Sequence, residues 1–133
     1  MAFSYSIHPD IRTVFLRFSG EVDGPQHSAA LDAAVQDPAW QVGFDWLVDM
    51  RHVALLHITL DDMATMRAQN QRLNRVGSRA RSALVMRPSD REIASLYATV
   101  VMRDFPPGVE RDVQVFLSMT EALAWLGLDA VPG

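Results

Sequence analysis

The segment Phe44–Arg51 (Phe-Asp-Trp-Leu-Val-Asp-Met-Arg) constrains the fold more than any other part of the chain. Apolar side chains alternate with aspartates along it, which is the spacing of a β-strand. Leu47 next to Val48 makes the middle of the segment apolar on both faces. A strand with two apolar faces is typical of a parallel sheet that is covered by helices on both sides. The segment therefore predicts an α/β fold in which Phe44–Arg51 is a central strand.

Four further strand patterns and four helix patterns accompany this segment. The residues His8-Pro9-Asp10 favour a turn between the first two strands, which predicts an antiparallel hairpin. The later strands are separated by helices, and strands joined by helical crossovers run parallel. The predicted order is ββαβαβαβα, a single domain with a mixed, mostly parallel five-stranded sheet flanked by about four helices. The strands are predicted near residues 3–7, 13–18, 44–51, 81–86 and 113–117, and the helices near 25–36, 60–76, 89–101 and 118–126.

Polar side chains gather where the central strand is predicted to end. Asp49, Arg51 and His52 emerge there, and ligands of open α/β sheets tend to bind outside the carboxyl ends of the parallel strands. Arg87 ends the neighbouring strand, and Ser89 opens the helix that follows. Guanidinium groups beside free helical N–H groups would form a site for an anion. These five residues are the candidate ligand site. The alternatives are that Asp49 orients Arg51 or caps loop amides, and that both arginines are solvated or ion-paired.

The apolar run Val53–Ile58 stands in what is predicted to be a connection, ahead of a mostly polar helix. One interpretation is that the run covers the end of the sheet. A second is an exposed patch that binds another copy of the chain or a partner, because contiguous apolar surface usually marks an interface. A third is that a hydrophobic small ligand lies beneath the run. The candidate interface residues are Val53, Leu55, Leu56, His57, Ile58 and Met63.

Three segments resemble the SpoIIAA-like proteins: Phe44–Arg51, Arg81–Met86 and Val113–Gly127. That family is related to the STAS domains, the fold of bacterial anti-sigma-factor antagonists. The resemblance extends from about Phe3 to Leu128 and implies a single SpoIIAA-like domain with a regulatory role. STAS domains are often compared with lipid-binding folds, so the analogy of fold also implies that a lipid-like ligand would fit.

The signalling antagonists carry an Asp-Ser pair, with a phosphorylatable serine, at the start of the helix after the corresponding strand. The equivalent residues here are His57-Ile58-Thr59, so the pair is absent. Thr59 precedes Leu60-Asp61-Asp62 and is predicted to be a helix N-cap, with acidic side chains at the positive end of the helix. A phosphate on Thr59 would be repelled by Asp61 and Asp62. An N-cap is therefore favoured over a phosphorylation site at Thr59.

Composition narrows the classes of function. A net charge of −4 provides no basic surface for nucleic acid. The chain has no cysteine, which excludes disulfides and thiolate chemistry. No apolar run approaches the ~20 residues that a membrane-spanning helix needs. The N-terminal residues lack the basic and apolar regions of a signal peptide. The expectation is a cytoplasmic, bacterial-type protein that is not transmembrane.

The sequence motifs do not indicate a catalytic or metal site. Asp49, His52 and His57 are near one another in the sequence but lack the spacing of metal ligands. Ser89 lacks the surroundings of a nucleophilic serine and forms a predicted capping box with Glu92. Ser118 and Glu121 repeat this pattern, which predicts an N-cap at Ser118. We therefore expect a non-enzymatic regulatory or protein-interaction module without a cofactor, which forms a homodimer or binds a regulatory protein. The alternative is a binder or sensor of a small anionic or amphipathic, lipid-like ligand.

Overall fold

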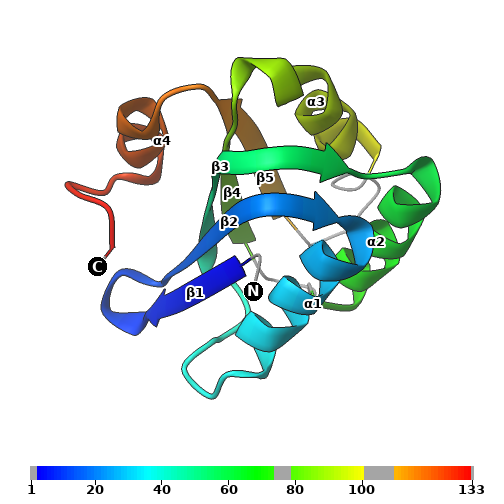
Figure 1. The fold of residues 1–133 in the computed structure, drawn as a ribbon. Coiled ribbons are helices and arrows are strands. Elements are labelled where there is room, and N and C mark those ends of the chain that lie inside the picture. The colour runs from blue at the N-terminus through cyan, green and yellow to red at the C-terminus, as the bar shows by residue number, and fades with distance from the viewer. Residues whose placement is uncertain (1–2, 74–78, 101–109, 133) are drawn as a thin grey trace.

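The computed structural model describes residues 3–73, 79–100 and 110–132 (Figure 1). The elements follow the predicted order ββαβαβαβα, so that prediction is confirmed. The predicted ends of the second and third helices, near residues 76–78 and 101–108, lie outside the described residues. The elements are β1 (Phe3–His8), η1 (Pro9–Ile11), β2 (Thr13–Asp23), α1 (Gly24–Gln36), β3 (Asp45–His57), α2 (Leu60–Leu73), β4 (Arg79–Val85), η2 (Pro88–Asp90), α3 (Arg91–Val100), β5 (Glu110–Phe116) and α4 (Met119–Leu126), where η denotes a short 3-10 helix.

The described strands form one sheet in the order β1-β2-β3-β4-β5, so each strand pairs with the strand that precedes it in the chain. β1 is antiparallel to β2, and every later pair is parallel. The hairpin turn contains Pro9 and Asp10, as its sequence predicted. The predicted mixed, mostly parallel sheet with one antiparallel strand is therefore confirmed.

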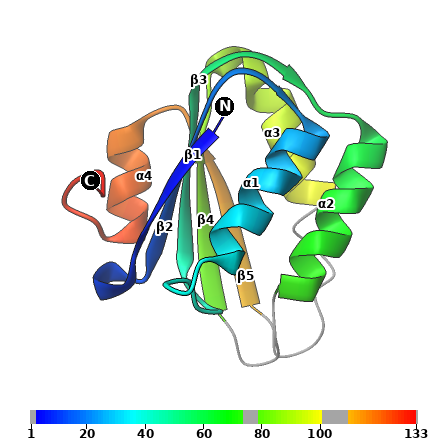
Figure 2. The same cartoon turned by 60° about the horizontal axis from the view of Figure 1, so that its bottom comes forward.

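In the described part of the chain, three helices cover one face of the sheet and α4 covers the other (Figure 2). α1, α2 and α3 each connect two parallel strands. Each new strand is added at the same edge of the sheet, and crossover connections have the same handedness, so the three helices lie on the same face. Successive side chains of a strand point to opposite faces. Trp46 and Val48 of β3 thus belong to the core that includes α1 and α3, whereas Leu47 packs in the cluster with Ala122 and Leu126 of α4. The central strand is covered on both sides, as predicted.

β3 is longer than predicted, which corrects the interpretation of Val53–Ile58 as a connection. The strand continues to His57, so Asp49 and Arg51 lie in its middle and not at its end. The physical reason lies in β2, which continues through Gly20 and stays paired with β3 as far as His57. Gly20 lies beyond the predicted end of the strand near residue 18, has φ +70° and lies at a shift in the strand register. A glycine bulge of this kind bends a strand without ending it.

β2 and β3 therefore project beyond the rest of the sheet. The last pair between β3 and β4 is Asp49 with Val85, whereas the pairing of β2 with β3 continues to Asp23 with His57. We call residues 50–57 of β3 the β3 extension. Figure 2 shows the two strands curving toward the tops of α1 and α2. This curvature places the β3 extension over the helices that follow β2 and β3.

Two predicted N-caps are confirmed. Thr59 Oγ1 accepts a hydrogen bond from the Asp62 N–H at 3.0 Å, and the Asp62 carboxylate accepts one from the Thr59 N–H at 2.9 Å. This reciprocal pair is a capping box at the start of α2. Ser118 Oγ accepts a hydrogen bond from the Glu121 N–H at 3.4 Å at the start of α4. Both helices thus begin where their capping residues predict.

Ser89 does not occupy its predicted N-cap. It lies inside η2, which begins at Pro88 and leads directly into α3. The residue before this first turn is Arg87, whose side chain makes no capping hydrogen bond. Proline is well suited to the first helical position because it has no N–H to satisfy there. The helical turn therefore starts too early for Ser89 to cap it together with Glu92.

Candidate functional site

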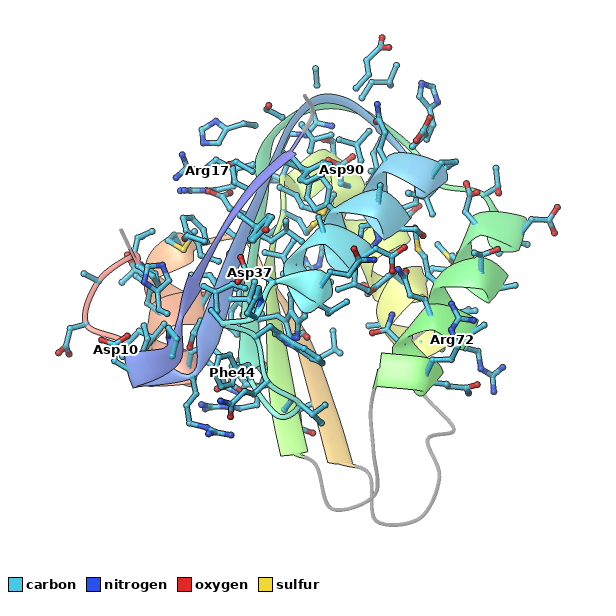
Figure 3. The ribbon with its side chains drawn as sticks, turned by 90° about the horizontal axis from the view of Figure 1, so that it is seen from below. Asp10, Arg17, Asp37, Phe44, Arg72 and Asp90 are labelled. Atoms are coloured by element: carbon cyan, nitrogen blue, oxygen red, sulfur yellow. The ribbon has the colours of Figure 1, made fainter. Side chains whose placement is uncertain are left out.

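Asp49 and Arg51 form a closely bonded pair on β3, on the same face of the sheet as Leu47. Arg51 donates from Nε to Asp49 Oδ1 and from Nη2 to Asp49 Oδ2, both at 2.9 Å, and its backbone N–H donates to Oδ1 at 3.1 Å. Arg17 pairs with Asp49 across the two strands, and its Nε lies 3.9 Å from Oδ2. Figure 3 shows Arg17 on the α4 side of the sheet. The geometry agrees with the alternative in which Asp49 orients Arg51.

Burial and Arg51 shift the pKa of the Asp49 carboxyl group in opposite directions. The Asp49 side chain is fully buried. Burial raises the pKa of a carboxyl group, because the ionised form loses its hydration. The hydrogen bonds and the positive charge of Arg51 outweigh that effect and hold the pKa of Asp49 below its usual value. The hydrogen bond to Asp49 also raises the pKa of Arg51. The pair therefore adds stability that is present above pH ~4 and is lost as the pH falls through the lowered pKa of Asp49.

Asp49→Asn is expected to lower the free energy of unfolding by about 2 kcal/mol. The amide would present an N–H donor to Arg51 where a carboxylate oxygen now accepts, and breaking a buried ion pair typically costs about 3–5 kcal/mol. Arg51 is partly exposed and can turn to water, which reduces the expected loss. Urea unfolding at pH 7 measures the change. Asp90→Asn is a matched control, because the Asp90 carboxylate is less buried in its pair with Arg87. A loss no greater than that of the control would contradict the prediction.

Arg87 bonds to other groups than Asp49. Its Nε donates to Asp90 Oδ2 at 2.8 Å, and its Nη1 donates to the carbonyl oxygen of Ala54 in the β3 extension at 3.1 Å. The hydrogen bond to Asp90 raises the pKa of Arg87. Ser89 is exposed in η2, and His52 is exposed on β3. The two candidate arginines thus use their guanidinium groups for ion pairs within the chain.

The candidate interface residues divide between the inside and the outside of the fold. Leu55 is 44% exposed, while Val53 in the same strand is buried. Strict alternation would place Val53 and Leu55 on the same face of the strand. The pairing with β2 shifts register between Gly20 and Glu21, opposite Val53 and Leu55, and the division falls at this irregularity. The buried or half-buried members are Val53, Leu56, Ile58 and Met63, and the exposed members are Leu55 and His57.

A small cavity lies between the sheet and α1, α2 and α3, beneath the inward-facing members of that set. Its volume is about 30 Å³. It lies at the carboxyl ends of β3 and β4, where ligands of α/β sheets usually bind, but on the opposite face from Asp49. We call it the methionine pocket. Eleven described residues line it: His27, Met50, Leu56, Ile58, Met63, Met66, Leu84, Met86, Ile93, Ala94 and Tyr97.

His27 is a polar residue of this pocket that the sequence interpretation did not single out. Its ring stacks on Phe18 of β2, with 5.5 Å between ring centroids and 4° between planes, and Tyr97 of α3 approaches it edge-on at 5.7 Å. Its Nδ1 atom is buried and has no hydrogen-bond partner among the described residues. Burial lowers the pKa of His27 to about 4. The signal in the sequence is its spacing from Leu31, one helical turn away on the same face of α1.

In the described ranges, no three His, Asp or Glu side chains are grouped as ligands for a metal ion. Within the same ranges, no helix has the length and apolarity needed to cross a membrane. Asp49, which the sequence placed near His52 and His57, is bonded instead to Arg51, and the two histidines are exposed.

Comparison with solved structures identifies the fold. The structure is similar to the crystal structure of an uncharacterized protein from the DUF3478 family with a SpoIIAA-like fold from Shewanella loihica PV-4, with a TM-score of 0.56 over 94% of each chain. The two sequences are 14% identical, so the likeness concerns the fold. No protein-family model and no curated protein matches the chain. The chain has a SpoIIAA-like fold, which confirms the fold that the sequence resemblance implied.

Proposed function

We propose that this SpoIIAA-like domain is a non-enzymatic regulatory module that binds a small apolar or amphipathic ligand in the methionine pocket. The pocket itself is the observation that supports the proposal, since it lies at the carboxyl ends of two central parallel strands. It also lies beneath the apolar run of the β3 extension. A ligand binder is expected to have a pocket at this place, whereas an interaction module is expected to have a flat apolar patch there.

The methionine pocket must widen to admit a ligand. Its volume of about 30 Å³ holds roughly two water molecules. Four of its lining residues are methionines, and an unbranched side chain with three rotatable bonds can rearrange around a guest more easily than a branched one. An apolar guest gains about 25 cal/mol for each Å² of its surface removed from water. An adaptable apolar wall therefore suits a ligand whose binding energy comes mainly from burial.

Widening the pocket would alter the molecular surface nearby. Met63 and Met66 line the pocket from the first half of α2, and Leu60 at the start of that helix is 68% exposed. A ligand that displaces α2 would move Leu60 relative to the exposed Leu55 of the β3 extension. A ligand shifts a protein only toward the conformation that it binds better. Binding of a ligand in the pocket would thus change the surface around Leu55 and Leu60, which a partner protein could contact.

The environment of His27 supports binding over catalysis. A general acid or base acts within hydrogen-bond reach of the group with which it exchanges a proton. His27 instead contacts the rings of Phe18 and Tyr97, and its Nδ1 has no partner among the described residues. Such a histidine can provide one hydrogen bond to a ligand.

The pair of Asp49 and Arg51 is a weaker candidate for binding an anion. Asp49 already occupies Nε and Nη2 of Arg51, so an anion would have to compete with a buried carboxylate. Arg87 is likewise bonded to Asp90. An anion could reach only the remaining N–H groups of either guanidinium, beside a carboxylate of the same charge. A guest in the apolar pocket on the other face meets no such repulsion.

A protein-interaction module is the second candidate function. Leu55 and Leu60 are large apolar side chains that are well exposed, and they lie on either side of the junction between β3 and α2. Exposed apolar side chains that lie close together favour a contact with another protein. The same surface would serve a homodimer or a regulatory partner.

Native mass spectrometry of the protein purified from its own cells tests both candidates. For the ligand binder, we expect a bound small molecule that is lost in Ala94→Leu, because Ala94 lines the pocket and is buried. Ser95→Leu, at the neighbouring exposed position, should keep it. For the interaction module, we expect a dimer that Leu55→Asp separates into monomers. A protein without a bound molecule, whose methionine methyl NMR signals do not respond to toluene, would contradict the ligand-binding proposal.

A further inference from the structure

The imidazole of His27 carries a hydrogen-bonding atom that the described residues do not satisfy. Its Nδ1 is buried beside the rings of Phe18 and Tyr97. Proteins leave few buried polar atoms unpaired, and each one calls for a partner such as an ordered water or a ligand. The parallel stacking on Phe18 holds the ring in one orientation. His27 is therefore a fixed polar contact in a mostly apolar wall.

His27 also lies where two cavities adjoin. A second cavity, of about 20 Å³, shares three lining side chains with the methionine pocket: His27, Leu84 and Tyr97. These side chains form the partition between the two spaces. A small rotation of Tyr97 past the fixed His27 ring would connect them. A guest that extends from the methionine pocket toward the second cavity would pass directly beside the imidazole.

The chemistry of a neutral imidazole defines the polar group that it would bind. One ring nitrogen carries a proton and donates, and the other accepts. A hydroxyl group both donates and accepts, so it can bond to Nδ1 in either tautomer. Burial lowers the pKa of His27 to about 4, so the ring provides no positive charge at pH 7. A charged ligand group would lose its hydration among methionine and aliphatic side chains without compensation.

We infer that His27 determines the specificity of the methionine pocket and selects an uncharged ligand with an apolar body and a hydroxyl group. The apolar body follows from the methionine and aliphatic lining, and the hydroxyl group follows from the buried Nδ1 at the partition between the two cavities. The inference rests on the proposed function and specifies its ligand.

Phenol, toluene and benzoate are suitable probes, because they share one ring and differ in the group attached to it. Titration of the ¹⁵N-labelled protein with each compound at pH 7 gives the affinity and the response of the His27 ring nitrogens. We expect phenol to shift the Nδ1 resonance of His27 and toluene to bind without that shift. Benzoate should bind at least about tenfold more weakly than phenol, because its charge would be buried without a partner.

Substitution of His27 separates its hydrogen bond from its packing. His27→Phe keeps a ring against Phe18 but removes the nitrogen, so the ratio of phenol affinity to toluene affinity should fall about tenfold. His27→Asn places an amide near the position of Nδ1 and should restore part of the ratio. Retained toluene binding in each variant shows that the pocket is still folded.

The outcomes of these titrations separate the inference from the proposed function. A ratio that falls in His27→Phe and recovers in His27→Asn supports the inference. A ratio that His27→Phe leaves unchanged, or a preference for benzoate, overturns the inference while the binding of toluene still supports the proposed function. Failure of both phenol and toluene to bind to the unsubstituted protein overturns the proposed function, and the inference with it.

Discussion

Acidification from pH 7 to pH 4 is expected to lower the free energy of unfolding by about 3 kcal/mol through His27 alone. Burial lowers the pKa of His27 to about 4 in the folded protein, whereas a histidine in an unfolded chain titrates near pH ~6.5. Between these values the unfolded chain binds a proton and the folded protein does not. At about 1.4 kcal/mol per pH unit, the difference amounts to about 3 kcal/mol. The loss starts near pH ~6.5 and levels off below pH ~4, where both states bind the proton.

Urea unfolding at pH 7, 5.5 and 4 measures this dependence. We expect His27→Phe to remove most of it, because phenylalanine does not titrate. His57→Gln should keep it, because His57 is exposed. The contribution of Asp49 falls in a separate range, since its pKa is held below its usual value and its effect begins where that of His27 ends. The same pH dependence in the unsubstituted protein and in His27→Phe would show that another group is responsible.

Phe18→Ala is expected to lower the free energy of unfolding by about 3–5 kcal/mol at pH 7. Phe18 is fully buried in the core that includes α1. Its ring lies 5.5 Å from that of His27 and 6.4 Å from that of Phe3, measured between centroids, so truncation removes contacts with both β1 and α1. The substitution also opens a cavity, which adds to the loss of buried apolar surface.

Urea unfolding at pH 7 tests the Phe18 prediction as well. Ile11→Ala is the control, because Ile11 is 40% exposed in the hairpin turn and should lose less than about 1 kcal/mol. Phe18→Leu should fall between the two, since it keeps most of the apolar volume. A loss in Phe18→Ala as small as that of the control would mean that the core relaxes around the deletion, contrary to the close packing described above.

Local patterns in the sequence were sufficient to predict the order of the elements. Alternation along Phe44–Arg51 identified a strand with two apolar faces, and the structure places Leu47 in the α4 cluster while Val48 belongs to the larger core. Thr59 and Ser118 predicted helix starts because an N-cap depends on the next three residues only. Such features are contained within a few neighbouring residues, so one sequence is enough to find them.

Pairing between distant strands could not be predicted in the same way. Gly20 read alone indicates the end of a strand, but its partner is Val53 in a segment more than thirty residues later in the chain. The apolar run beginning at Val53 likewise indicates a connection when it is read alone. Only the alignment of β2 with β3 shows that both segments continue as strands. Tertiary pairing thus outweighed the local signal.

The methionine pocket depends on burial, which the sequence does not display. From the sequence, Leu56, Ile58 and Met63 are candidates for an interface, and a hydrophobic ligand beneath the apolar run is an alternative. His27 was missed because a single histidine in an alanine-rich helix has no motif around it, and its significance comes from Phe18 and Tyr97, which belong to other elements. The spacing of His27 and Leu31 showed which face of the helix it shares, but not what that face would meet.

The order of the strands has a consequence for biosynthesis. Each strand pairs with the one made just before it, so a chain emerging from the ribosome can add one strand and one helix at a time. The face of the sheet that α4 covers is completed differently. Phe15, Leu47 and Val85 are in place before α4 has been translated, and α4 is the helix that packs against them. We expect the nascent chain to expose this apolar face until residues 119–126 emerge, which makes that interval one of aggregation risk during synthesis.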